Sequence, residues 1–320
     1  MKRSIGACEK YHGAVIDHVG NENTRVFREI TALGAELEKL GSQTLGARTD
    51  AKAAIVFDWD NWWGISYSAG PTIYLDYCQE ILRYYKALHN KNIPVDMIGV
   101  EDDLSRYSLV IAPVLYMVKG NYDEKIRTFV KNGGRFLTTF FSGYVDEHDL
   151  VTTGGYPGKL RDILGIWVEE EDALPSDMEN SFSYQGKTYP AKMLCDLLHT
   201  EGAEALGSYD KDFYAGMPVL TKNAFGKYVA TSSDDDFYSD YLSEICADAG
   251  IHPLMDTPAT VEVTMRSNAN GSFLFILNHG EEAYEATLPY SGTDLLSGAS
   301  YREGENFSLP AKDVILLKLS

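Results

Sequence analysis

Short apolar runs alternate with helical patterns between residues 53 and 141, and this alternation limits the possible folds more than any other feature of the sequence. The runs are AAIVFDWD at 53–60, PVDMIG at 94–99, SLVIAPV at 108–114 and RFLTTFF at 135–141. Apolar strands separated by helices are typical of a parallel sheet that is covered on both faces. We therefore expect an α/β domain with a doubly wound parallel sheet of flavodoxin-like type.

The helices of this region are predicted from apolar positions that recur every three or four residues. One helix is expected from about Thr72, with a stripe of Ile73, Tyr77, Ile81, Tyr85 and Leu88, and another around Ile126, Phe129 and Val130. Residues 159–250 continue the alternation less regularly, with helical patterns at KLRDILG, AKMLCDLLH and FYSDYLSEICADAG, which are residues 159–165, 191–199 and 237–250.

The two ends of the chain have a different texture. An amphipathic helix is predicted from a cap at Asn23 or Thr24 to about Gly41, with an apolar stripe of Val26, Ile30, Leu33, Leu37 and Leu40. The small polar residues 42–51 form the first boundary. After Pro258, the runs TVEVTM, SFLFILN, YEATLP and VILLKLS alternate with turn signals and predict a small all-β domain. We expect domains at 1–46, 50–256 and 259–320.

Charge and cysteine content exclude several classes of function. The 320 residues hold 28 Lys and Arg against 47 Asp and Glu, a formal charge of −19, so nucleic acid and anionic membranes are poor partners. The four cysteines lie far apart without metal-ligand spacing, and neither a G-x-G-x-x-G motif nor a P-loop occurs. We expect no metal and no cofactor. Because no apolar run is long enough to cross a membrane, we expect a cytoplasmic protein.

Three long segments carry a resemblance to a known family. They are RSIGACEKYHGAVIDHVG at 3–20 with TRVFRE behind it, IVFDWDNWWG at 55–64, and TTFFSGYVDEHDLVTTGGYPGKLRDILGI at 138–166. The chain resembles the family-42 glycoside hydrolases, which are β-galactosidases. The resemblance implies that residues 1–46 are the last strand and helix of a TIM-type (β/α)8 barrel. It also implies an amidotransferase-like trimerisation domain at 50–256 and a small β-sandwich domain at 259–320.

The same resemblance implies what this chain does and does not do. A retaining glycoside hydrolase needs two carboxylates about 5–5.5 Å apart, and in this family both belong to barrel strands that would precede Met1. We therefore expect the chain alone to act in homotrimer assembly without hydrolase activity, and to meet a galactoside only as part of an intact enzyme. The alternative is a free-standing amidotransferase-like or small-molecule-binding α/β domain.

Several residues are candidates for these roles. Glu9 and His12, in E-K-Y-H, match family positions whose side chains reach the galactose hydroxyls. At least one of Trp62 and Trp63 is expected at a subunit interface or at the rim of a neighbouring active site, because aromatic rings anchor interfaces and stack on sugars. Trp59 is expected in the domain core. For the alternative function, Ser142 follows a strand where amidotransferase-like folds carry a nucleophile, with His148 near it in sequence.

Overall fold

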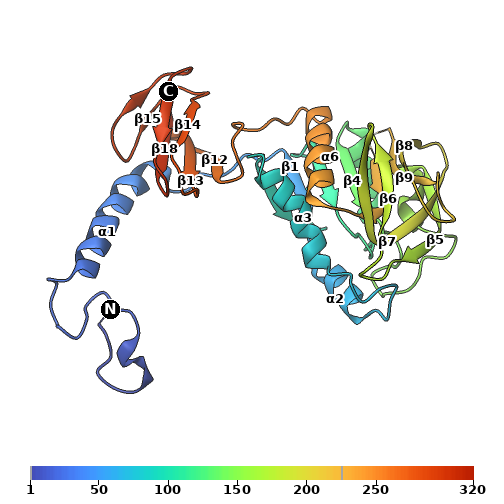
Figure 1. Cartoon of the computed structure of the whole chain (residues 1–320), viewed down its shortest axis with the longest axis horizontal. Coiled ribbons are helices and arrows are strands. Elements are labelled where there is room, and N and C mark those ends of the chain that lie inside the picture. Colours follow the sequence, from blue (N-terminus) through green and yellow to red (C-terminus); the bar gives the residue numbers. More distant parts are fainter. Residues whose placement is uncertain (1, 225) are drawn as a thin grey trace. The chain divides into compact units, whose positions relative to one another are not determined.

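The computed structural model describes residues 2–224 and 226–320 and divides into two compact units (Figure 1). Unit 1 combines Met1–Asp50 with Thr260–Ser320, and unit 2 is Ala51–Ala259. The N-terminal segment and the C-terminal β region thus pack as one unit, although they lie at opposite ends of the sequence.

Parallel strands form one side of the large sheet of unit 2. They are β1 (Ala53–Val56), β2 (Val95–Ile98), β3 (Leu109–Ala112), β4 (Arg135–Thr139) and β10 (Gly226–Val229). Their order is β2-β1-β3-β4-β10, and each neighbouring pair is parallel. Every residue of β1 and β3 is buried, as expected for strands with helices on both faces. The four strands predicted from apolar runs before residue 141 are confirmed.

The four longer helices of unit 2 begin at acidic or amide caps. They are α2 (Trp59–Tyr67), α3 (Tyr77–His89), α4 (Tyr122–Lys131) and α6 (Asp235–Asp248). Asp58, Asp76 and Asp234 each accept a hydrogen bond from a backbone N–H in the first turn of the helix that follows. The start predicted for α3 near Thr72 is wrong, because the helix begins after the Asp76 cap and Ile73 is 89% exposed in the preceding loop.

Residues 166–223 are antiparallel strands, and here the predicted continuation of the strand and helix alternation is wrong. The strands are β5 (Ile166–Ala173), β6 (Asn180–Tyr184), β7 (Lys187–Thr200), β8 (Glu204–Tyr209) and β9 (Pro218–Asn223), with β11 (Thr231–Ser232) beside β7. The helix expected at 191–199 lies within β7. Leu194–Leu198 are all buried, and a run that is buried on both faces has no strand-like alternation to reveal it.

The other two helical patterns of this region have different outcomes. The pattern at 159–165 becomes a short 3-10 turn, η2 (Gly158–Leu160), and one helical turn, α5 (Arg161–Leu164). Gly165 ends it with φ of 63°, the left-handed conformation typical of a residue that follows a helix. The pattern at 237–250 is confirmed by α6.

Unit 1 contains α1 (Arg25–Thr44) and two antiparallel sheets in its described residues. One sheet has the order β12 (Val261–Asn268), β13 (Gly271–Asn278), β18 (Val314–Leu319), β15 (Gly292–Asp294) and β16 (Ser300–Tyr301). The other pairs β14 (Tyr284–Thr287) with β17 (Asn306–Leu309). The end of α1 is fixed to the first sheet, because the Asn268 amide donates to Gln43 O (2.8 Å) and Arg48 forms a β-bridge with Ser267.

The predicted barrel strand near Gly6 does not form in this structure. The segment holds a 3-10 turn, η1 (Cys8–Tyr11), and an isolated bridge between Lys2 and Ile16. None of residues 2–50 is buried. A strand needs ladder partners on its edges, and the described residues supply none to this segment. The predicted helix is confirmed, capped by Thr24, and its stripe from Val26 to Leu37 is between 39% and 59% exposed.

Candidate functional site

The loops that follow β1, β3 and β4 meet at one edge of the parallel sheet. The loops are residues 57–68, which include α2, residues 113–120 and residues 140–158. Val118 N donates to Val145 O (2.9 Å), which joins the second loop to the third. A Cβ placed on Gly64 would lie 3.3 Å from the Tyr116 ring, so α2 packs directly on the second loop. The three loops therefore form one continuous structure.

Side chains of the protein itself occupy the junction between β1 and β3. Asn61 is fully buried, donates to Asp58 Oδ2 (2.8 Å) and accepts from Met117 N (2.8 Å). Lys119 Nζ donates to Asp58 Oδ1 (2.6 Å) and Asp60 Oδ2 (2.8 Å). Burial lowers the pKa of Lys119, but the hydrogen bonds to the two carboxylates outweigh burial and the pKa is raised overall. Parallel α/β sheets usually bind ligands at such a junction. Here its polar groups bind one another.

Stacked aromatic rings hold the third loop. Phe141 stacks on Tyr116 (5.0 Å between ring centres) and contacts Tyr144 (4.5 Å), which in turn stacks on Tyr156 (3.7 Å). The Tyr116 hydroxyl donates to Asp149 Oδ1 (3.0 Å). Tyr116 thus connects α2, which it contacts through Gly64, to the middle of the third loop.

Ser142 is part of this buried framework and is not a nucleophile. Its side chain is fully buried. Its Oγ accepts from Leu115 N (2.9 Å) and shares a hydrogen bond with Thr138 Oγ1 (2.9 Å). His148 is exposed on the loop. A nucleophile must be open to substrate and activated by a base, so the geometry does not support the alternative hydrolase function.

Exposed aromatic side chains lie on α2 and on the loop after it. We call Trp59 and Trp63, whose ring centres lie 6.1 Å apart, the aromatic surface; Trp59 is 56% exposed and Trp63 is 52% exposed. The prediction that Trp59 belongs to the core is therefore wrong. Asn61 and Ile65, four residues apart, form the buried side of α2, and Trp59 and Trp63 share the opposite side. Trp62 is partly buried against the core.

The predicted sugar-binding residues lie together in unit 1. Glu9 and His12 are both exposed, and the 3-10 turn that joins them is closed by the hydrogen bond from His12 N to Glu9 O (3.0 Å). Arg3 pairs with Asp17 (2.8 Å) across the same segment. The structure brings Glu9 and His12 close in the chain, and their role toward a sugar stays a prediction.

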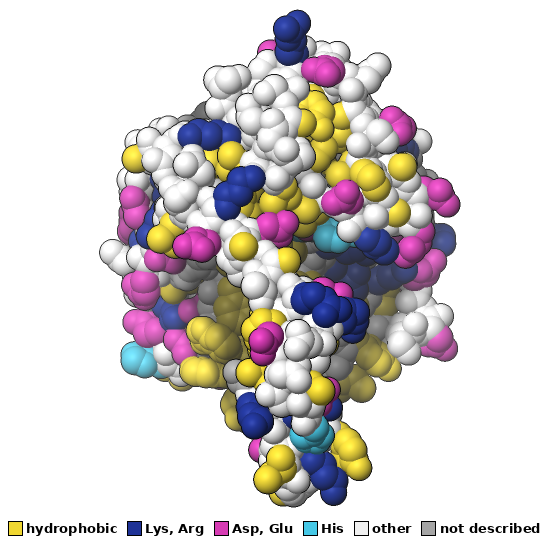
Figure 2. Space-filling view, turned by 90° about the vertical axis from the view of Figure 1, so that its left-hand side faces the viewer, with side chains coloured by type: hydrophobic (Ala, Val, Ile, Leu, Met, Phe, Trp, Pro, Cys, Tyr) yellow, Lys and Arg dark blue, Asp and Glu magenta, His cyan; other side chains and the backbone are white. Residues whose placement is uncertain are grey.

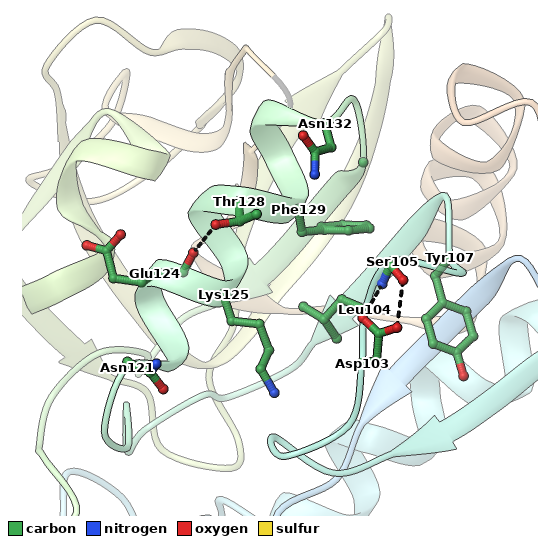
Figure 3. Close-up of a pocket in the computed structure, with 11 residues that line it drawn as sticks. Asp103, Leu104, Ser105, Tyr107, Asn121, Glu124, Lys125, Thr128, Phe129 and Asn132 are labelled. Carbon is green, nitrogen blue, oxygen red and sulfur yellow. Dashed lines mark hydrogen bonds between the residues drawn. The ribbon is translucent and has the colours of Figure 1, made fainter.

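A pocket of about 420 Å³ lies between residues 103–107 and α4 (Figure 3). Phe129 of α4 and Leu104 are among the residues that line it. Its charged groups are already bonded within the protein: Lys125 Nζ donates to the carbonyl oxygens of Val100 and Asp102, and Asp103 accepts from Ser105. The pocket therefore presents few polar groups that are free to orient a ligand.

Two absences concern the residues that the structure describes. Among them, no helix is long and apolar enough to cross a membrane, and no group of three or more His, Cys, Asp or Glu side chains is placed to hold a metal ion. Acidic and basic side chains are interspersed on the face shown in Figure 2.

The fold defines an α/β module joined in sequence to a β domain. Comparison with protein families makes the assignment specific. Residues 51–252 match the β-galactosidase trimerisation domain, residues 260–319 the β-galactosidase C-terminal domain and residues 1–40 the β-galactosidase family-42 domain. The chain belongs to the family-42 β-galactosidases and corresponds to their C-terminal portion, which confirms the resemblance found in the sequence.

Individual relatives agree with this assignment. The chain is 52% identical to β-galactosidase BgaA of Planococcus strain 'SOS Orange' and 50% identical to BgaP of Planococcus strain L4, in each case over 99% of this chain and 48% of the relative. The crystal structure of β-galactosidase from Bacillus circulans sp. alkalophilus matches with a TM-score of 0.94 and 46% identity, over 100% of this chain and 49% of that one. The chain thus spans about half the length of these relatives.

Sequence reasoning did not find Tyr116, Lys119, Asn61 or Asp149. Asp58 and Asn61 carry a local signal, because an Asp directly after a strand and before a helix is a typical cap. Tyr116 and Asp149 carry none, since their roles arise from contacts between loops that are distant in sequence.

Proposed function

We propose that this chain forms the trimer of a cytoplasmic family-42 β-galactosidase and has no hydrolase activity of its own. Residues 50–256 are the trimerisation domain, with a flavodoxin-like, amidotransferase-like sheet. The strand order β2-β1-β3-β4-β10 supports that fold assignment. Residues 1–46 are the end of the catalytic barrel, and residues 259–320 are a β-sandwich domain. In the intact enzyme, two carboxylates outside these residues hydrolyse a terminal β-galactoside.

The observation that carries this proposal is the aromatic surface. Trp and Tyr are enriched at the energetic centres of interfaces, and each buries about 150–250 Å² when it is covered. The surface rests on a rigid base, because Asp58 caps α2 and Lys119 ties the first turn of α2 to the neighbouring loop. A rigid base favours association, since few side chains must be ordered on binding. Trp63, and the partly buried Trp62 next to it in sequence, would contact a second copy of the chain.

Glu9 and His12 are proposed as sugar ligands of the intact enzyme. A carboxylate that accepts and an imidazole that donates or accepts suit the hydroxyl groups of galactose. Both side chains are exposed in this structure. Substitution of either by Ala in an intact relative is expected to raise KM more than it lowers kcat if the residue binds sugar equally in the ground and transition states.

Self-association can be tested with the chain's own cysteine. Cys8 is the exposed one among the four cysteines. Separate preparations labelled at Cys8 with a donor or an acceptor dye are expected to show energy transfer on mixing, and unlabelled chain should suppress it. The same preparations should release no nitrophenol from a nitrophenyl β-galactoside. Energy transfer that is absent at every concentration would contradict the proposal, and so would hydrolysis by the chain alone.

A further inference from the structure

Two carboxyl groups oppose each other within the sheet of unit 2. Glu171 on β5 lies directly opposite Asp196 on β7 in the antiparallel register. Opposed residues in such a pair have Cβ atoms about 4.5–5.5 Å apart, and their side chains leave the sheet on the same side. The two carboxyl groups are therefore neighbours on one face of the sheet.

Each of these carboxyl groups has a buried oxygen without a partner. Asp196 is fully buried, and its Oδ2 accepts from the Tyr228 hydroxyl (2.6 Å) and from Phe141 N (3.4 Å). Among the described residues, Asp196 Oδ1 and Glu171 Oε1 have no hydrogen-bond partner. Unpaired buried oxygens and facing like charges both destabilise a fold. One proton between the two oxygens removes both effects, because one carboxyl then donates and the other accepts.

The groups around the pair favour the protonated form. Burial, together with the charge of Glu171, raises the pKa of Asp196 to about 8 despite the hydrogen bonds from Tyr228 and Phe141 N. Burial also raises the pKa of Glu171. Tyr228 on β10 and Tyr209 on β8 face Asp196, and burial keeps the pKa of each hydroxyl well above its usual value. Among the described residues, no Lys or Arg lowers the pKa of either carboxyl.

We propose that Glu171 and Asp196 share one proton at neutral pH and that this shared proton makes the loop of residues 140–158 sensitive to alkaline pH. Asp196 accepts from the backbone N–H of Phe141, the second residue of this loop. Phe141 has φ of 57°, an uncommon conformation for a residue other than glycine. Loss of the proton leaves two negative charges that face each other, one on β5 and one on β7. Their repulsion weakens the pairing of these two strands next to the hydrogen bond between Asp196 and Phe141. The dissociation of the trimer that we expect at alkaline pH rests on the proposed function, whereas the shared proton does not.

The proton count predicts how folding depends on pH. An unfolded Asp ionises near pH 4, whereas the folded pair keeps its proton up to about pH 8. Because the folded state binds one proton that the unfolded state lacks, the folding equilibrium constant falls about tenfold per pH unit within that window. Asp196→Asn and Glu171→Gln keep the shape and turn one carboxyl into an amide, whose N–H can donate to the remaining carboxylate without a shared proton. Each should lose this part of the slope in urea titrations followed by tryptophan fluorescence, and Glu170→Gln, an exposed neighbour on β5, should keep it.

Two further readouts separate the shared proton from its effect on assembly. The infrared C=O band of a protonated carboxyl group should be present at pH 6 in the wild-type protein and lost in Asp196→Asn. The proposal is overturned if the wild type, Asp196→Asn and Glu171→Gln share one stability slope. Light scattering should show dissociation above pH 8 in the wild type and less in Glu171→Gln. A trimer whose mass does not depend on pH would overturn the link between the shared proton and assembly. A monomer at every pH would contradict the proposed function, and the infrared band would still test the shared proton.

Discussion

Gly143 permits the close approach that shapes the loop of residues 140–158, so Gly143→Ala is expected to destabilise unit 2 strongly. Its φ is 72°, in the left-handed region that costs a residue with a Cβ about 1–2 kcal/mol. In addition, a Cβ there would lie 2.1 Å from Pro157 O, which is backbone and cannot turn aside. Relieving such an overlap costs about 1–3 kcal/mol more. We expect a total loss of about 3 kcal/mol.

Gly186→Ala is the matched control. Gly186 lies in the turn between β6 and β7 with φ of 77°, and a Cβ there would meet no atom within 4 Å. This variant should lose about 1 kcal/mol from backbone strain alone. The difference between the two variants therefore isolates the contact between Gly143 and Pro157.

Urea unfolding followed by tryptophan fluorescence is the assay. All four tryptophans lie at positions 59, 62, 63 and 167, within unit 2, so the signal reports this unit alone. The midpoint should fall for both variants, and further for Gly143→Ala at an unchanged denaturant slope. Equal losses in the two variants would refute the reasoning, because the contact with Pro157 would then have no energetic effect.

Three further predictions concern assembly and the loops at the edge of the sheet. Trp63→Ala should dissociate the assembly at concentrations where Phe213→Ala, which removes another exposed ring, does not; sedimentation velocity distinguishes the two. Lys119→Met should lower the free energy of unfolding of unit 2 by about 2 kcal/mol in urea titrations, because it leaves the Asp58 carboxylate buried without its cation. Asp60→Asn should change the free energy of unfolding little, because the Asp60 side chain is half exposed. Each chain carries a charge of −19, so raising salt from about 50 to about 500 mM should tighten association; weakening by salt would contradict an interface built on apolar rings.

Local periodicity predicted much of the fold. The helix α1 follows from the regular spacing of apolar residues and the first four parallel strands from short apolar runs, and the structure contains them. Prediction failed where burial on both faces removed the pattern, as in Leu194–Leu198 of β7. It also failed before the Asp76 cap, where Ile73 continues the helical spacing but lies outside the helix. The hydrogen bond of the Asp76 cap sets the first residue of this helix, which the spacing of apolar residues alone did not determine.

The candidate site was predictable only in part. The Trp62-Trp63 pair indicated an exposed or interfacial role from composition, and Trp63 is exposed. The orientation of Trp59 depends on the exact start of α2, which the sequence pattern did not indicate. The support of Tyr116 for the loop of residues 140–158 depends on contacts between segments that only the folded sheet brings together. Such tertiary contacts have no local sequence pattern.

Self-assembly is the central claim, and the absolute mass of the chain in solution tests it most directly. Multi-angle light scattering at neutral pH and near-physiological salt should give three times the chain mass of 35.6 kDa over a range of protein concentrations. A mass that stays at 35.6 kDa at every concentration would contradict the account.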